Sequence, residues 1–165
     1  MNDIDNIRRC ARDLDLFLSK IERDYGLCIS LHTSDAFLEF LKNEQTHNLH
    51  KVHYCELVKC AKHSTSPCMR MQRFVTASFD RSPEPRFGRC VFGVDEFVIP
   101  AFSRGKAIGF ISVSGYSFDR AATLERAKRL FGVISPDVEH AVAELKPVAP
   151  SPETLRALLS PAADL

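Results

Sequence analysis

Apolar residues recur at alternating three- and four-residue steps along the first part of the chain, which predicts a long amphipathic helix over residues 3–24. The residues of this stripe are Ile4, Ile7, Ala11, Leu14, Leu18 and Ile21. Asp3 can cap the start of the helix, and Gly26 follows its end. The stripe is heptad-like, and Leu16 and Phe17 widen it. The helix is therefore expected to pack on its own domain, to pair with its copy in a homodimer, or to do both.

One strand and three further helices are expected in the middle of the chain. Residues 27–31 form a short apolar run that is typical of a strand, and Ser34 can cap an amphipathic helix after it. The polar stretch 43–53 is expected to be loop. Residues 54–62 are expected to form a short helix, and residues 67–79 another, because proline suits the first turn of a helix.

The segment 87–116 has the residue types and the alternation of β-structure. Three strands are expected, over residues 89–93, 96–102 and 107–114. Residues 103–106, Ser-Arg-Gly-Lys, have the composition of a hairpin turn. Two helices are expected next, over residues 118–131 and 135–146. Three prolines within the following six residues indicate that residues 148–165 form a linker and tail, with at most a short helix from Glu153 and disorder expected over residues 160–165.

This order of elements predicts an α+β fold, with an antiparallel sheet flanked by helices that lie on one side of it. No regular βαβ alternation and no internal repeat are present. Such an arrangement resembles that of PAS and GAF sensory domains, which hold a small ligand between sheet and helices. A chain of 165 residues fits one domain, expected over residues 1–147.

Composition and charge argue against binding to nucleic acid and against insertion in a membrane. The formal net charge is +1, so there is no basic surplus of the kind that binds nucleic acid. No stretch approaches the ~18 consecutive apolar residues of a membrane span. The start of the chain also lacks the apolar run of a signal peptide. We therefore expect a cytoplasmic protein, in a compartment that keeps thiols reduced.

Cysteine is frequent for a chain of this length. The six cysteines are Cys10, Cys28, Cys55, Cys60, Cys68 and Cys90. In a reducing compartment the four between residues 55 and 90 indicate a metal site, a redox site or buried filler before they indicate disulfides. Cys55 and Cys68 stand at expected helix starts, where the helix dipole lowers a thiol pKa, and Cys90 stands on an expected strand.

Motifs of common catalytic sites are missing from the sequence. The glycine-rich nucleotide loops and Gly-x-Ser-x-Gly are absent, so the chain is not expected to be an enzyme. An enzyme with Cys55 or Cys90 as nucleophile and His53 as base stays an alternative, as does a structural zinc-bound interaction domain. Cys10 and Cys28 are expected to fill the core.

Five segments carry a resemblance to a known family. They are HYCELVK at 53–59, CMR at 68–70, RCVFGVDEFVIP at 89–100, GKAIG at 105–109 and SGY at 114–116. In these segments the chain resembles the PocR-type sensory domain, over about residues 20–135. The positions that match the family pattern are Cys55, Cys68, Cys90, Gly93, Pro100 and Gly115.

The resemblance implies a regulatory input domain with a PAS- or GAF-like core. Such domains are usually fused to a DNA-binding or histidine-kinase output and are thought to recognise small hydrocarbon-derived molecules. Val91 stands where the family usually has His, and Tyr116 where it usually has Gln. These departures imply a less polar ligand, or none. The expected function is therefore signal transduction, with a signalling protein or a further output domain as partner.

A metal or iron–sulfur site is the first site expected. The resemblance implies that Cys55, Cys68 and Cys90 converge, and Cys60 or His53 would complete four-coordination. Thiolates suit zinc and iron–sulfur clusters. Two alternatives stay open: a thiol switch, in which two of these cysteines join under oxidation without metal, and buried thiols that never meet.

A pocket for a small ligand is the second site expected, between the sheet of residues 89–116 and the helices of residues 54–79. Small-molecule sites are mostly apolar with a few placed polar groups. The expected walls are Phe92, Phe97, Phe110 and Tyr116, and the expected polar contacts are Ser112 and Ser114. The alternative is that these aromatic residues only fill the core.

Overall fold

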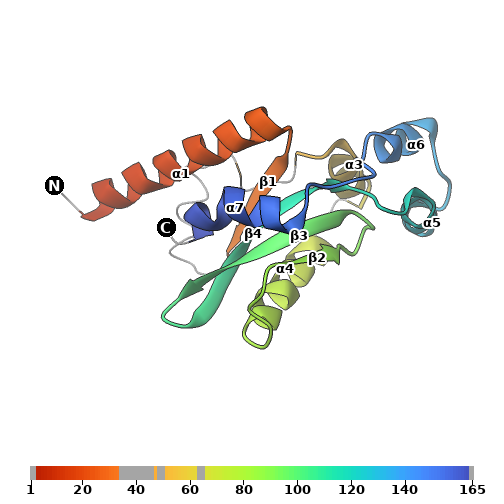
Figure 1. Ribbon diagram of the computed structural model, residues 1–165. Coiled ribbons are helices and arrows are strands. Elements are labelled where there is room, and N and C mark those ends of the chain that lie inside the picture. Colours follow the sequence, from red (N-terminus) through yellow and green to blue (C-terminus); the bar gives the residue numbers. More distant parts are fainter. Residues whose placement is uncertain (1–2, 34–46, 48–50, 63–65, 164–165) are drawn as a thin grey trace.

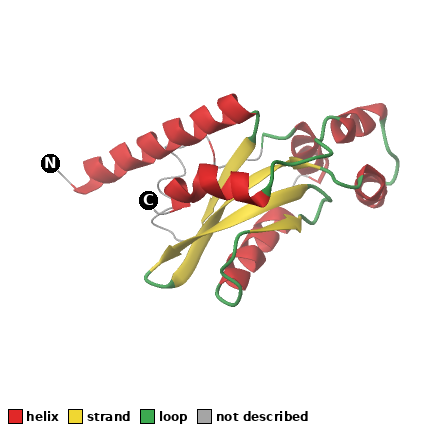
Figure 2. Ribbon diagram, in the orientation of Figure 1, coloured by secondary structure: helices red, strands yellow, loops and turns green. Residues whose placement is uncertain are grey.

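The computed structural model describes residues 3–33, 47, 51–62 and 66–163, which form an α+β fold (Figures 1 and 2). Its elements are α1 (Asp3–Tyr25), β1 (Cys28–Thr33), α3 (His53–Lys62), α4 (Ser66–Phe79), β2 (Arg86–Arg89), β3 (Asp95–Ser103), β4 (Lys106–Tyr116), α5 (Arg120–Phe131), α6 (Pro136–Ala143) and α7 (Pro152–Ala163). The expected antiparallel sheet flanked by helices is confirmed. The helix expected after Ser34 lies outside the described residues.

The sheet has four antiparallel strands in the order β1-β4-β3-β2. The turn between β3 and β4 is the hairpin expected at residues 103–106, where Ser103 pairs with Lys106. Arg104 and Gly105 both have positive φ, 50° and 77°, as a two-residue turn that follows the twist of the strands requires. This hairpin sets the register of the two central strands.

Helices cover both faces of the sheet, whereas the sequence suggested one side. On one face, α1 and α7 pack against alternate residues of β1, β3 and β4 (Figure 1). This core includes Leu18, Ile29, Phe97, Ile111, Val113, Leu155 and Leu159. On the other face, Phe79 of α4 packs against Val98 and Phe110. Because a strand alternates its side chains, each central strand supplies both layers.

The C-terminal residues differ from the expected linker and tail. Residues 152–163 form α7, and Leu155 and Leu159 are fully buried against the sheet. These two leucines are four residues apart and so share one helix face. Ser151 accepts a hydrogen bond from the Thr154 amide at 3.2 Å and caps the helix start. The prolines before α7 indicated a linker with at most a short helix after it, and the packing of that helix on the sheet was not expected.

A second core cluster lies at one end of the sheet, where α3, α5 and α6 gather (Figure 1). Its centre is Tyr54, which is fully buried and donates a hydrogen bond to the Phe92 carbonyl oxygen at 3.1 Å. Val138 and Val142 of α6 pack in the same cluster. The cluster fixes the start of α3 against the turn that follows β2.

That turn replaces the first strand expected in this region. Residues 89–93 were expected to be β-structure, but β2 ends at Arg89. The Cys90 amide donates to the Val94 carbonyl oxygen at 2.8 Å, and the Gly93 amide donates to the Cys90 carbonyl oxygen at 3.0 Å. Gly93 has φ of 92°, a backbone conformation that favours glycine. The chain therefore reverses direction at Cys90–Val94 and continues as β3.

A fully buried histidine ties one residue of the long connection after β1 to α1. The ring nitrogens of His47 lie 2.7 Å from an Asp15 carboxylate oxygen and 3.2 Å from a Glu22 carboxylate oxygen. The other oxygen of Glu22 accepts a hydrogen bond from the Ile29 amide at 2.7 Å.

Among the described residues, no helix combines the length and the apolar character that a membrane span needs.

Candidate functional site

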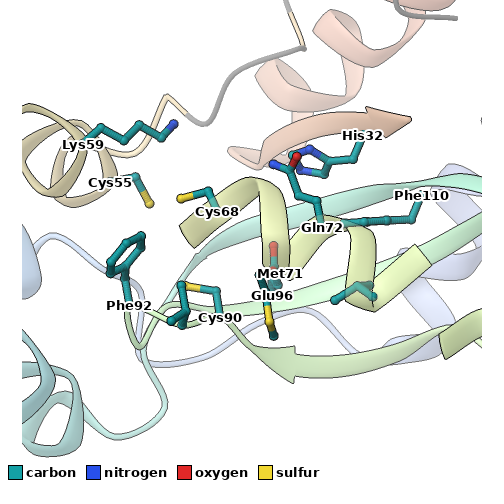
Figure 3. A pocket seen from close by; sticks show the side chains of 12 residues that line it. His32, Cys55, Lys59, Cys68, Met71, Gln72, Cys90, Phe92, Glu96 and Phe110 are labelled. Carbon is teal, nitrogen blue, oxygen red and sulfur yellow. The ribbon is translucent and has the colours of Figure 1, made fainter. Parts of the chain in front are cut away.

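A small cavity lies between the sheet and the helices α3 and α4 (Figure 3). We call it the thiol cavity; its volume is about 30 Å³, enough for one or two waters or a few ligand atoms. Its described lining residues are His32, Cys55, Lys59, Cys68, Met71, Gln72, Val75, Cys90, Val91, Phe92, Glu96 and Phe110. This cavity lies where the ligand pocket was expected, between the sheet and the helices of residues 54–79.

Three cysteines from separate elements line the thiol cavity. Cys55 lies in the first turn of α3, Cys68 in the first turn of α4, and Cys90 in the turn after β2. In Figure 3 the sulfur atoms of Cys55 and Cys68 point toward each other, and Cys90 lies on the opposite wall. The three cysteines that were expected to share a site all line this cavity, although Cys90 comes from a turn and not from a strand.

Burial keeps these thiols protonated. Desolvation raises the pKa of Cys90 to about 12 and raises the thiol pKa of Cys55 and of Cys68 as well. The expectation that the helix starts would lower these pKa values is wrong, because the loss of solvent outweighs the helix dipole. A protonated thiol is a poor nucleophile and a poor metal ligand.

The expected metal site is wrong. Among the described residues, no group of three or more His, Cys, Asp or Glu side chains can hold a metal ion, so neither zinc nor an iron–sulfur cluster has a ligand set there. The two residues expected to complete the site lie elsewhere. Cys60 is exposed on α3, and His53 is exposed with its Nδ1 3.0 Å from a Glu144 carboxylate oxygen.

A buried polar network borders the other side of the thiol cavity. The Ser112 hydroxyl donates a hydrogen bond to the Glu96 carboxylate, and Ser112 Oγ lies 3.2 Å from His32 Nε2. All three side chains are buried. Burial raises the pKa of Glu96 to about 7, while the hydrogen bond from Ser112 opposes this rise. The Glu96 carboxyl group therefore changes charge near neutral pH.

The neighbouring carboxylate, that of Asp95, is also buried, but a cation of the same fold pairs with it. Arg89 donates to both of its oxygens, at 2.6 and 3.1 Å. The Phe118 amide donates a third hydrogen bond to Asp95 at 2.8 Å. Glu96, on the opposite face of β3, has no such cation within the described residues.

The expected ligand-contacting residues divide between the two faces of the sheet. Phe92 and Phe110 line the thiol cavity. Phe97 and Tyr116 instead belong to the core under α1 and α7, so their expected role as walls is wrong. The two serines divide as well. Ser112 forms hydrogen bonds with the cavity residues Glu96 and His32, whereas Ser114 lines a different cavity.

That second cavity, of about 210 Å³, lies where β1 and β4 meet α3 and α6. Cys28 and Ser114 line it together with His53, Glu144 and Lys146. Burial raises the pKa of the Cys28 thiol, and Ser114 opposes this rise. Cys28 is thus partly buried in a cavity wall and Cys10 is exposed, so the expectation that both fill the core is wrong.

Sequence reasoning missed Glu96, His32, Lys59, Met71 and Gln72 as cavity residues. A signal for the first two exists in the sequence. Glu96 is an acidic residue at the start of an otherwise apolar strand, and His32 falls in the same alternation phase as Ser30 on β1. Buried polar side chains in one phase of a strand are unusual unless that face carries a function.

Comparison of the chain with protein-family models, with curated proteins and with solved structures finds no match.

Proposed function

We propose that the chain is a signal-transduction sensory domain that binds a small organic ligand in the thiol cavity and regulates a partner protein or a further output domain. The observation that carries this proposal is the buried polar face of the sheet beneath α4. Ser30, His32, Glu96 and Ser112 lie there, each at most 7% exposed, beside a cavity with apolar walls. The resemblance to PocR-type domains, and with it a PAS- or GAF-like architecture, belongs to the same proposal.

Energetics favour a binding role for this face. A buried polar group costs about 1–3 kcal/mol when its hydrogen bonds are not replaced, so a face that served only for packing would be apolar. The centre of the opposite face is apolar, with Ile29, Phe97, Ile111 and Val113 in one core, and the buried Asp95 on that face is paired with Arg89. The four buried polar residues of the face beneath α4 thus lie beside a cavity, as a ligand site requires.

Two side chains that line the thiol cavity can change conformation to fit ligands of different shape. Met71 and Gln72 are long, unbranched side chains on α4, and both are only partly buried. Methionine accommodates different shapes because it has several rotatable bonds. A ligand larger than a few atoms can enter if these two side chains change rotamer.

Catalysis by a cysteine nucleophile has less support. The thiol pKa values of Cys55 and Cys90 are raised, which removes the thiolate that such a reaction needs. His53, the base expected for that reaction, is exposed and lies outside the lining of the thiol cavity.

A blocked cavity tests the sensory proposal. A panel of small alcohols, amines, acids and aromatics is screened for an increase in Tm of the wild-type chain. Cys68→Tyr fills the thiol cavity, whereas Cys60→Tyr places the same side chain on the exposed side of α3. We expect Cys68→Tyr to abolish the Tm increase and Cys60→Tyr to retain it. A wild-type chain that responds to no compound, or equal responses in both variants, would refute the proposal.

A further inference from the structure

Glu96 is an uncompensated buried carboxyl group at the wall of the thiol cavity. Among the described lining residues it is the only side chain with a carboxyl group. Its hydrogen-bond partner is the Ser112 hydroxyl, and no Lys, Arg or His forms an ion pair with it in the described part of the chain. A carboxylate buried without a cation is costly, and a bound cation would remove that cost.

The other titratable groups that line the cavity do not neutralise the negative charge of the Glu96 carboxylate. They are His32 from β1, Cys55 and Lys59 from α3, Cys68 from α4 and Cys90 from the turn after β2. The positive charge of Lys59 acts on the thiols of Cys55 and Cys68 but does not contribute to the pKa of Glu96. Figure 3 likewise places Lys59 beside Cys55, on the far side of the cavity from Glu96. The three thiols are uncharged near neutral pH because burial raises their pKa values.

The walls around Glu96 suit a short alkyl chain that ends in a positive charge. Phe110 lies two residues from Ser112 on the same face of β4, and its ring is 4.7 Å from the His32 ring. Phe92 and Val75 provide apolar surface in the same cavity. An aromatic face attracts an ammonium group, and apolar walls favour an alkyl group.

We propose that the ligand of the thiol cavity is a small protonated alkylamine, whose ammonium group pairs with the Glu96 carboxylate and whose alkyl chain contacts Phe92 and Val75. This inference rests on the proposed sensory function and names its ligand class. An alcohol of the same size fills the same space but cannot neutralise Glu96. A carboxylic acid of the same size places a second negative charge beside it, which is unfavourable.

The pairing makes binding depend on pH in a defined direction. The ammonium group binds the ionised form of Glu96, whose pKa is raised to about 7. The ionised fraction then rises from about one-tenth at pH 6 to about nine-tenths at pH 8, while a simple amine stays protonated across this range. The affinity for the amine is therefore expected to rise about tenfold between these two pH values.

An NMR titration of the full chain with three probes of similar size tests this inference. Ethylammonium chloride, ethanol and potassium acetate are added separately at pH 6 and pH 8, at constant ionic strength. A ligand of three heavy atoms reaches at best a Kd of about a millimolar, which chemical-shift titration detects. We expect ethylammonium to shift amide signals around residues 90–98 and 110–114, with a Kd about tenfold lower at pH 8.

Two glutamine variants separate pairing with Glu96 from general charge effects. Glu96→Gln should remove both the binding of ethylammonium and its pH dependence. Glu56→Gln, on the exposed face of α3, should leave both unchanged. Ethanol or acetate binding in the cavity at least as tightly as ethylammonium would overturn the amine assignment and leave the sensory proposal standing. Retained amine binding in Glu96→Gln would also overturn it. If no small molecule binds and Cys68→Tyr changes nothing, both proposals fail.

Discussion

Asp95 and Glu96 are adjacent carboxyl groups that β3 buries on opposite faces of the sheet, with opposite consequences. Asp95 accepts three hydrogen bonds, two of them from Arg89, so its charge is balanced within the fold. Glu96 accepts one from Ser112 and faces a cavity. Ionisation of Glu96, whose pKa burial raises to about 7, therefore opposes folding.

Glu96 is expected to make the stability of the protein depend on pH. Its pKa is raised from 4.5 to about 7 in the folded state, so the folded chain binds more protons than the unfolded chain between these values. Stability therefore falls as pH rises through this window, by up to about 3 kcal/mol. Glu96→Gln removes this decrease. Urea denaturation at pH 5 and pH 8 should show the variant gaining stability relative to wild type as pH rises.

Glu56→Gln is the control for that experiment, because Glu56 is exposed and its substitution should leave the wild-type pH dependence unchanged. Parallel pH–stability curves for the wild type and Glu96→Gln would show that Glu96 ionises as freely in the folded state as in the unfolded chain. The buried carboxyl assignment would then be wrong.

At the scale of elements, the pairing of β1 with β4 depends on a glycine. Gly109 lies opposite Thr33, and a Cβ at this position would overlap the His32 carbonyl oxygen and lie 2.9 Å from the Thr33 Cα. Both clashes are with backbone, which cannot move away unless β1 separates from β4. Since β1 carries His32, the same pairing also positions one wall of the thiol cavity.

Gly109→Ala should therefore lower the free energy of unfolding by about 2–3 kcal/mol, as overpacking against rigid neighbours does. Gly88→Ala is the matched control, because Gly88 lies on the edge strand β2 with no atom within 4 Å of the added Cβ. We expect the control to remain within about 0.5 kcal/mol of wild type. Equal effects of the two substitutions in urea denaturation would contradict the close approach of β1 and β4.

Elements with strong local signals could be predicted from the sequence. The helix at residues 3–24 and the turn at residues 103–106 carry such signals, and the structure has both. The assignment of residues to faces could not be predicted, because it depends on register between strands distant in sequence. Ser112 and Ser114 share a phase on β4, but one lies beneath the thiol cavity and the other borders a different one. Glu96 was missed because its sequence signal, an acidic residue at the start of an apolar strand, is shared by its neighbour Asp95, which Arg89 pairs with in the structure.

At the scale of the whole molecule, the two ends of the chain form one layer. Helices α1 and α7 pack side by side on the apolar face of the sheet, with Leu18 and Leu159 both fully buried (Figure 1). The sequence predicted α1 but not the role of α7, since the prolines at 147–152 indicated a linker. The polar face with its cavity is thereby left to α3 and α4, separate from the layer that joins the termini.

The layer of α1 and α7 also bears on the expected homodimer. Leu18 belongs to the heptad-like stripe, but it is fully buried within its own chain. A charge at this position would disrupt the core and could not report on association. Leu16, in contrast, is 68% exposed on α1, and Phe17 beside it is only partly buried. Any dimer built on α1 therefore uses the side of the helix that carries Leu16.

We expect the chain to form a homodimer through this side of α1, because pairing two copies would remove Leu16 from water. Leu16→Glu should weaken the dimer at least about tenfold, since it places two like charges in the seam and leaves the core intact. Val133→Glu is the control, because Val133 is 80% exposed in the connection between α5 and α6. Sedimentation velocity over a range of concentrations should show a dimer for the wild type and Val133→Glu, and a folded monomer for Leu16→Glu. A wild type that sediments as a monomer at every concentration would show that α1 serves its own domain alone.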